Sequence, residues 1–157
     1  MKREEGSRFL HFCLGKEEYA IPLLVVREVI ALPDMTPVPF MPSYFVGIMN
    51  LRGQVISVLD LRKKMGIQPV DRGETSVIIC TLQNLIFGVI VDAVSSVLDL
   101  RSDEIAPPPD LRTGGKAGCI SGVYKMDTGL VLLLEIGNVL DLEDYRAVDR
   151  SAAGQVA

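Results

Sequence analysis

The sequence has no tryptophan, a single histidine and only three cysteines. Cys13, Cys80 and Cys119 are far apart and form no Cys-x-x-Cys pair. The sequence therefore indicates neither a zinc site nor a disulfide framework. All three cysteines lie in apolar runs, which predicts small buried side chains in a reducing compartment.

Long apolar runs are also missing. A membrane-spanning helix needs about 18 or more consecutive apolar residues, and the longest runs here, 77–80 and 130–134, have the length of strands. Residues 1–8 are charged, and no apolar segment of a secretory signal follows them. We therefore expect a cytoplasmic protein without a transmembrane helix.

Basic charge is not in excess. The chain has 16 Lys and Arg against 20 Asp and Glu, for a net charge of -4. This balance gives no electrostatic footprint for nucleic acid, so no nucleic-acid partner is expected. The one short basic run, Arg62-Lys63-Lys64, is interpreted as the solvated face of a helix and not as a phosphate site.

Catalytic motifs are absent as well. A Ser-His-Asp or Cys-His arrangement would need His11, which lies between two apolar residues of a predicted strand. Alternation places its side chain opposite the core face, so we expect it on the surface. Gly114-Gly115-Lys116 lacks the spacing of a phosphate-binding loop. The carboxylates are scattered without metal-ligand spacing, among them Asp92, Asp99, Asp103 and Glu104. We expect no catalytic residue, no metal and no cofactor.

An internal repeat is the first positive feature. Residues 14–23 align with 82–91 at an offset of 68, and residues 47–48 align with 122–123 at an offset of 75. Pairs of similar residues at these offsets include Tyr19 and Phe87, Ile21 and Val89, Val26 and Val94, Val29 and Val97, Pro39 and Pro107, and Asp60 and Glu135. The repeat predicts two similar lobes built from one ancestral unit.

Short strands dominate the predicted secondary structure. Apolar runs bounded by turn residues predict the hairpins 9–14 with 19–21, 44–51 with 54–59, 76–82 with 86–91, and 119–126 with 130–134. Short helices are predicted at 22–29, 61–65 and 136–142, and 94–98 fits a helix or a strand. Asp60 is a good N-cap for the second helix, and Gly66 suits its C-terminal end. Four prolines in residues 33–42 predict an extended crossing segment.

Many short strands with glycine or proline turns indicate small β-barrels. We therefore predict a mainly β fold with two lobes of about five strands each.

Two charged residues stand out. Arg52, in the turn between two predicted strands, is either an exposed cation that pairs with a partner or a structural arginine that joins the two lobes. Both roles can hold together. Glu28, in an otherwise apolar stretch, is either a functional carboxylate or part of a solvated helix face.

The matching valines of the repeat form another candidate. Val26, Val29, Val94 and Val97 either belong to the core or line a seam between the lobes. Such a seam would suit a partner helix laid into an apolar groove.

Three segments together carry a family resemblance: Asn50-Leu51-Arg52-Gly53, Asp60-Leu61-Arg62 and the run 91–98, which reads VDAVSSVL. In these segments the chain resembles the CheW family, the coupling proteins of bacterial chemotaxis. The resemblance extends over residues 9–142, as one domain with two pseudo-repeated lobes. Residues 1–8 and 143–157 are left as polar tails.

The resemblance implies two intertwined five-stranded SH3-like β-barrels with a few short helices. It also implies a non-enzymatic cytoplasmic adaptor, without a cofactor, that is recruited to membrane receptor arrays. Its expected partners are the regulatory domain of a CheA-type histidine kinase and the cytoplasmic tip of a chemoreceptor. The alternatives are a CheW-like adaptor in a non-chemotaxis array, such as twitching or developmental signalling, and a small-ligand sensor with a pocket between the lobes.

By position, the resemblance also implies a set of partner-binding residues. Glu28 and Arg52 match residues implicated in coupling, Val26 and Val97 lie near the receptor groove, and Gly53 is the motif glycine. Leu111 belongs to a segment that resembles a secondary ring contact, where an aromatic residue is sometimes seen. The complete implied set is Val26, Glu28, Asn50, Leu51, Arg52, Gly53, Arg62, Val97 and Leu111.

Overall fold

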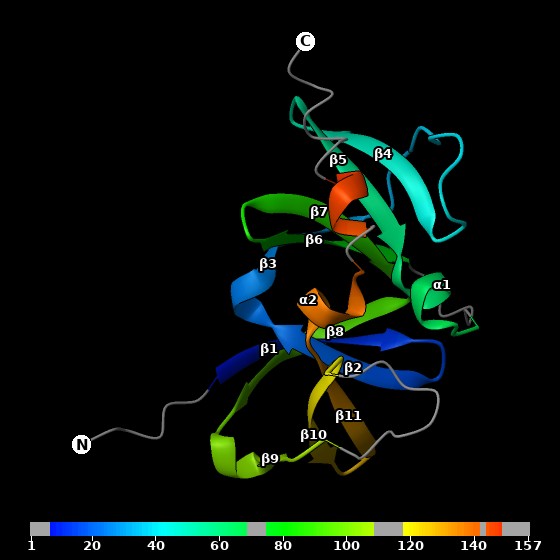
Figure 1. The fold of residues 1–157 in the computed structure, drawn as a ribbon. Coiled ribbons are helices and arrows are strands. Elements are labelled where there is room, and N and C mark those ends of the chain that lie inside the picture. The colour runs from blue at the N-terminus through cyan, green and yellow to red at the C-terminus, as the bar shows by residue number, and fades with distance from the viewer. Residues whose placement is uncertain (1–6, 69–74, 109–117, 142–143, 149–157) are drawn as a thin grey trace.

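The computed structural model describes residues 7–68, 75–108, 118–141 and 144–148, and it consists mainly of strands in two sheets (Figure 1). The strands are β1 (Ser7–Leu14), β2 (Glu17–Pro22), β3 (Val26–Ala31), β4 (Phe45–Leu51), β5 (Gln54–Asp60), β6 (Ser76–Leu82), β7 (Leu85–Val91), β8 (Ala93–Leu100), β9 (Ile105–Ala106), β10 (Ile120–Met126) and β11 (Gly129–Leu134). The short helices are η1 (Leu23–Val25), α1 (Leu61–Met65), η2 (Ser102–Glu104) and α2 (Ile136–Val139).

Each sheet takes strands from both halves of the chain. The six-stranded sheet has the order β8-β1-β2-β11-β10-β9, and the five-stranded sheet has the order β3-β6-β7-β5-β4. Two parallel contacts, β2 with β11 and β5 with β7, join strands of different halves. The predicted mainly β fold with two intertwined units is therefore confirmed, although one sheet has six strands because β9 adds to it.

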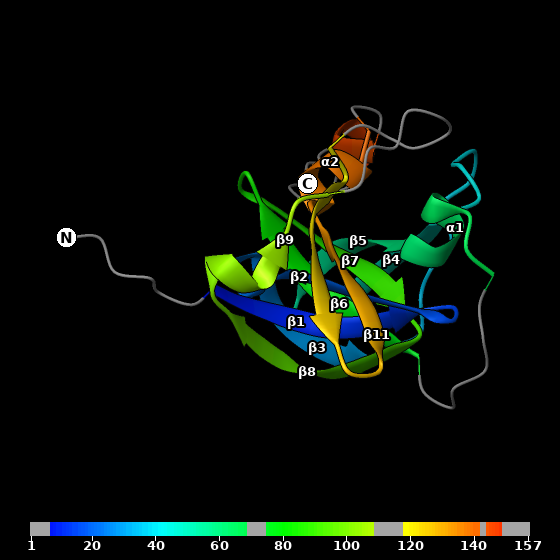
Figure 2. The same cartoon turned by 90° about the horizontal axis from the view of Figure 1, so that it is seen from below.

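The order of the elements follows the two offsets of the predicted repeat. The bounds of β4 and β10 differ by 75 at both ends, and β2 and β7 begin 68 residues apart. Short helices follow β5 and β11 at equivalent places. Figure 2 shows the same arrangement from below, with β10 and β11, two strands of the six-stranded sheet, in front in this view.

Three apolar clusters hold the fold together. The largest lies between the two sheets and includes Phe12, Leu59, Phe87 and Ile136. Figure 1 shows α2 between the two sheets, where it contributes to this cluster. Each sheet also has a cluster of its own, with Ile79 in the five-stranded sheet. Strands β1, β2, β6 and β7 are therefore buried on both faces, which explains their continuous apolar runs.

Local chemistry fixes the start and the end of α1. The Asp60 carboxylate accepts a hydrogen bond from the Arg62 amide at 3.0 Å and a longer one from the Lys63 amide at 3.4 Å. Gly66 ends the helix in the left-handed conformation, at φ 70°. Both signals were read correctly from the sequence.

Two other predictions about elements were wrong. The helix expected at 22–29 is only the single turn η1, and the chain then continues as β3, because β-branched residues dominate from Val25 onward. Residues 144–148 do not behave as part of a polar tail. They form a helical turn in which Ala147 and Val148 are buried against the central cluster.

The prediction that His11 lies on the surface is wrong. Its side chain is buried, and Nε2 lies 2.5 Å from Oε1 of Glu18. Alternation was read correctly, but the face opposite the central cluster also has a core of its own, which includes Phe9. A strand in the middle of this sheet therefore has no solvated face.

Cysteine burial follows the prediction for two of the three residues. Cys13 and Cys80 are buried, whereas Cys119 is partly exposed. Burial raises the pKa of Cys80 to about 12, which keeps this thiol protonated and unreactive at neutral pH.

Candidate functional site

The candidate site is built on the tight hairpin between β4 and β5. Leu51 pairs with Gln54 across a two-residue loop, and both loop residues, Arg52 at φ 51° and Gly53 at φ 86°, have left-handed backbone conformations. Two consecutive positive φ values are typical of the turn that matches the twist of a hairpin. The Asn50 side chain accepts a hydrogen bond from the Gly53 amide at 2.8 Å, so the motif residues hold the turn in shape.

Arg52 extends from this turn to β3, the edge strand at the other side of the same sheet. Its guanidinium donates a hydrogen bond to the Glu28 carboxylate on β3, and its side chain remains 67% exposed. The pair therefore links β3 to the β4–β5 turn at one end of the five-stranded sheet. Two residues that the resemblance implied as partner-binding are thus in direct contact on the surface.

A β-bulge lies beside this pair. Val26 pairs with Cys80 and Glu28 pairs with Ile79, so Arg27 is the extra residue between them. A bulge turns the side chain of its extra residue away from the regular alternation. Arg27 is exposed, and together with Arg52 it lines a hollow of 190 Å³. The hollow is completed by Leu51, Gln54, Ile56, Ile79 and Ile86.

Arg62, although implied as partner-binding, points inward. Its guanidinium bonds to Asp60 at 3.0 Å and to Asp92 at 2.6 Å, and only 15% of its side chain is exposed. The hydrogen bond to Asp60 raises the pKa of Arg62, and the bond to Asp92 adds to this effect. Burial lowers the pKa, but the two hydrogen bonds outweigh it, so the pKa is raised overall. Asp92 also accepts a hydrogen bond from the Gly15 amide at 2.5 Å. Arg62 therefore ties α1 to the β1–β2 turn of the other sheet.

Lys64 is also turned inward, so the basic run is not a solvated helix face, although Lys63 is exposed. Lys64 Nζ lies 2.6 Å from Asp141 and 2.8 Å from the buried Asp144, and it sits 4.4 Å above the Tyr44 ring. Burial lowers the pKa of Lys64, but hydrogen bonds to Asp141, Asp144 and Tyr44 outweigh it and raise the pKa overall. The basic run thus fastens α1 to the C-terminal part of the chain.

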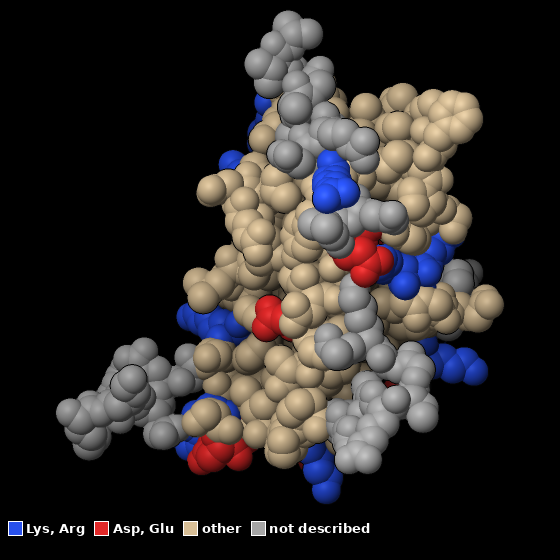
Figure 3. Space-filling model, viewed as in Figure 1, with Lys and Arg blue, Asp and Glu red and all other residues tan. Residues whose placement is uncertain are grey.

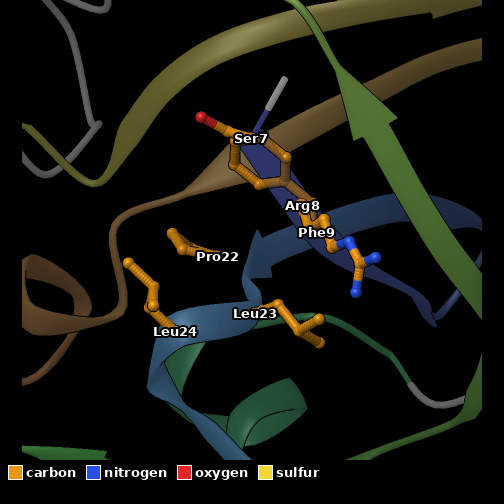
Figure 4. A pocket seen from close by; sticks show the side chains of 6 residues that line it. All are labelled: Ser7, Arg8, Phe9, Pro22, Leu23 and Leu24. Carbon is orange, nitrogen blue, oxygen red and sulfur yellow. The ribbon is translucent and has the colours of Figure 1, made fainter. Parts of the chain in front are cut away.

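A larger and more apolar hollow lies where η1 meets the start of β1. It measures 550 Å³ and is lined by Ser7, Arg8, Phe9, Pro22, Leu23 and Leu24 (Figure 4). Leu24 is almost fully exposed, at 98%. Its neighbour Val25 packs against the central cluster instead. Together with Phe9, Pro22 and Leu23, the exposed Leu24 forms a contiguous apolar surface, and such surfaces often bind other proteins.

The remaining implied residues differ in exposure. Val26 and Val94 pack against the central cluster, whereas their neighbours Val29 and Val97 are 39% and 50% exposed. The four valines thus divide into a core pair and an exposed pair. Leu111 lies outside the described residues.

Sequence reasoning did not single out Arg27 or Leu24. The bulge that re-aims Arg27 is a property of strand pairing, and no residue type announces it. Leu24 lies within the helix predicted at 22–29, and a leucine in such an apolar run gives no sign of full exposure.

The face in Figure 3 shows acidic and basic side chains scattered among uncharged ones, without a continuous patch of one sign. Within the described ranges, no group of three or more His, Cys, Asp or Glu side chains is arranged to hold a metal ion. In the same ranges, none of the helices has the length and apolar character needed to cross a membrane.

Comparisons with known proteins show the family of the chain. A family model described as a CheW-like domain matches residues 8–144. The chemotaxis protein CheW of Klebsiella aerogenes is 33% identical over 148 residues, covering 94% of this chain and 89% of that protein. The chemotaxis protein CheW of Rhizobium meliloti is 29% identical, covering 90% of this chain and 92% of that protein.

A solved structure supports the same assignment. The crystal structure of the scaffolding protein TtCheW from Thermoanaerobacter tengcongensis has a TM-score of 0.79 and 28% sequence identity to this chain. The match covers 88% of this chain and 95% of that one. A further relative, protein FrzA of Myxococcus xanthus, is 29% identical and covers 92% of this chain and 91% of its own length.

Proposed function

The chain belongs to the CheW family and is a coupling scaffold of bacterial chemotaxis, and on this premise we propose how it makes its two contacts. One surface binds the regulatory domain of a CheA-type histidine kinase, and another binds the cytoplasmic tip of a chemoreceptor. The chain carries out no reaction of its own. It is recruited to membrane arrays through the receptor, and its geometry between the two partners sets the kinase output.

The observation that supports this proposal best is the Arg52–Glu28 pair. The turn that carries Arg52 is held by Asn50, and the pair connects two elements of one sheet while leaving the guanidinium mostly exposed. An arginine that is oriented by one carboxylate and still open to solvent can bind a second acceptor on a partner. We therefore place Arg52 in a partner contact.

The apolar hollow beside Leu24 suits the second contact. Its lining is mostly apolar, and its size of 550 Å³ accommodates several side chains of a docked helix. We assign this hollow to the receptor, whose helical hairpin offers an apolar stripe. Each contact is expected to be modest, and the array strengthens both through avidity.

The test is binding of purified kinase regulatory domain and receptor fragment to Arg52→Glu. We expect loss of binding to at least one partner and an unchanged melting temperature. Arg101→Glu is the matched control, because Arg101 is also an exposed arginine, 60% exposed, that pairs with a nearby carboxylate, Asp103. Wild-type binding by the Arg52 variant to both partners would refute the assignment.

A charge swap separates the two roles of Arg52. The double variant Glu28→Arg with Arg52→Glu restores the internal pair with its direction reversed. Rescue of binding would assign Arg52 a purely structural role, whereas continued loss would mean that the partner contacts Arg52 itself.

The alternative of an adaptor in a non-chemotaxis array is tested by the receptors that bind. Pull-down from lysate of the source cells, followed by mass spectrometry, identifies them. Recovery of receptors that serve a process other than chemotaxis would favour the alternative.

A further inference from the structure

The hollow at the end of the five-stranded sheet has an unusual combination of charge and apolar surface. Its floor is formed by Ile56 and Ile79, which are buried, together with the partly buried Leu51 and Ile86. Its rim carries Arg27, Arg52 and Gln54. The protein has a net charge of -4, so two arginines beside an apolar depression form a local exception.

The two arginines are not equivalent. Arg52 is paired with Glu28, whereas Arg27 makes no ion pair and no hydrogen bond with its side chain among the described residues. Because Glu28 neutralises Arg52, the hollow keeps the charge of Arg27 alone. An exposed guanidinium of this kind keeps all its donors for an outside acceptor.

The backbone explains why Arg27 faces the hollow. Arg27 is the extra residue of the β3 bulge, and its neighbours pair with β6 on either side. The bulge is fixed by the core, because Val26 packs against the central cluster. The orientation of Arg27 is thus set by the fold and does not depend on a surface partner.

Resting on the proposed scaffold function, we propose that Arg27 determines which partner surface this end of the sheet accepts. The occupant is a segment of a partner protein that presents one large apolar side chain with a carboxylate beside it. The apolar side chain fills the 190 Å³ hollow, and the carboxylate binds the Arg27 guanidinium. A partner with a lysine or arginine at the same place is rejected by like charge.

The experiment measures binding of full-length chain variants to the kinase regulatory domain and to the receptor fragment, each alone. The series is wild type, Arg27→Lys, Arg27→Gln and Arg27→Glu. For one of the two partners we expect affinity to fall in that order, by about tenfold or more for Arg27→Glu, with the Lys variant closest to wild type. The affinity for the other partner should stay within about twofold of the wild-type value.

Salt provides a readout that a merely structural role would not move. Affinity of the wild type for the sensitive partner falls with added salt, and Arg27→Gln shows a weaker dependence. Lys63→Glu is the control for Arg27→Glu. Lys63 is exposed on α1, and both substitutions change the net charge by the same amount. All variants should keep the wild-type melting temperature because Arg27 is exposed.

The outcomes are distinct. Wild-type affinity of Arg27→Glu for both partners overturns the role of Arg27 and leaves the scaffold function standing. An equal loss in Arg27→Glu and Lys63→Glu also overturns it, because net charge would then explain the effect. Failure of the wild type to bind either partner overturns the scaffold function, and the role of Arg27 falls with it.

Discussion

The two halves of the chain share one backbone plan but present different side chains at equivalent ends of their sheets. Arg27 and Arg52 mark the end of the five-stranded sheet, and the residues at the matching places in the other half are Ser95 and Asp127. Both Arg27 and Ser95 are the extra residues of bulges. The duplication thus preserved the shape of the two ends while their charges diverged, so the two surfaces can bind different partners.

Strand register shows how closely the plan was preserved. Tyr19 pairs with Leu132 in one sheet, and Phe87 pairs with Ser57 in the other. Tyr19 and Phe87 differ by 68, and Ser57 and Leu132 differ by 75, which are the two offsets of the repeat. Register is fixed by packing on both faces, since a shift of one residue would move every side chain to the opposite face, where it would no longer fit its neighbours.

The interiors of the halves differ more than their backbones. The pair of buried His11 and partly exposed Glu18 has Ile79 and Ile86 at the equivalent places of the other sheet. Arg62, which joins the two sheets through Asp92, corresponds to Gly137. The residues at the places equivalent to His11, Glu18 and Arg62 cannot make these polar pairs, and removing the pairs tests what they contribute.

Removing the Arg62 guanidinium should have the largest effect. Arg62→Ala leaves the buried carboxylates of Asp60 and Asp92 without their cation, and we expect a loss of about 3–5 kcal/mol in the free energy of unfolding. Urea denaturation measures it, with Arg101→Ala as the exposed control. A loss below about 1 kcal/mol would mean that solvent or the remaining amides satisfy both carboxylates.

A matched pair of glycines comes next. A Cβ on Gly47 would lie 2.3 Å from the Thr36 carbonyl oxygen, whereas a Cβ on Gly122 would lie 2.5 Å from a methyl of Ile105. A backbone oxygen yields less readily than a side-chain methyl. We therefore expect Gly47→Ala to cost about 3 kcal/mol and Gly122→Ala about half of that, by thermal and urea unfolding. Equal losses would show that the two contacts yield to the same degree.

The two β-hairpin turns give a smaller contrast. Gly53 has φ 86° with open space around it, so Gly53→Val is strained by its backbone alone and should cost about 1–3 kcal/mol. Thr128 holds the equivalent place without a positive φ, and Thr128→Val should change stability by less than about 0.5 kcal/mol. A wild-type melting temperature in Gly53→Val would contradict the strain argument.

The smallest net change in stability is expected when His11 and Glu18 are replaced by isoleucine, the residue at the equivalent places of the other half. Replacing both His11 and Glu18 by isoleucine should leave the stability within about 1 kcal/mol of wild type, because replacing both members of a hydrogen-bonded pair by apolar side chains is often nearly neutral. Glu18→Ile alone leaves buried His11 without its partner and should cost about 1–3 kcal/mol. A double variant less stable than either single one would show that the pair is required.

The sequence was sufficient for the fold because its signals were local and repeated. Asp60 and Gly66 marked the ends of a helix, and turn residues marked the hairpins. The position of His11 could not be predicted, since alternation along a strand does not reveal whether the second face is also covered. Arg62 and Lys64 have the composition of a surface run, and only the tertiary contacts to Asp92 and Asp144 turn them inward.

The candidate site was predicted in part. The turn residues could be located from Asn50 and Gly53, whose backbone requirements follow from their types. The contact between Arg52 and Glu28 joins residues 24 positions apart, and their proximity depends on how β3 and β5 are placed in one sheet. The hollow beside them depends on the same placement.

The parallel contacts of β2 with β11 and of β5 with β7 also have a consequence for synthesis. When the first half leaves the ribosome, β2 and β5 have an open edge until the second half is made. Neither half can complete a sheet alone, so the nascent chain exposes apolar strands for most of its translation. The two sheets should consequently form only after β11 has been made, and truncated chains that end before β7 should aggregate or be degraded.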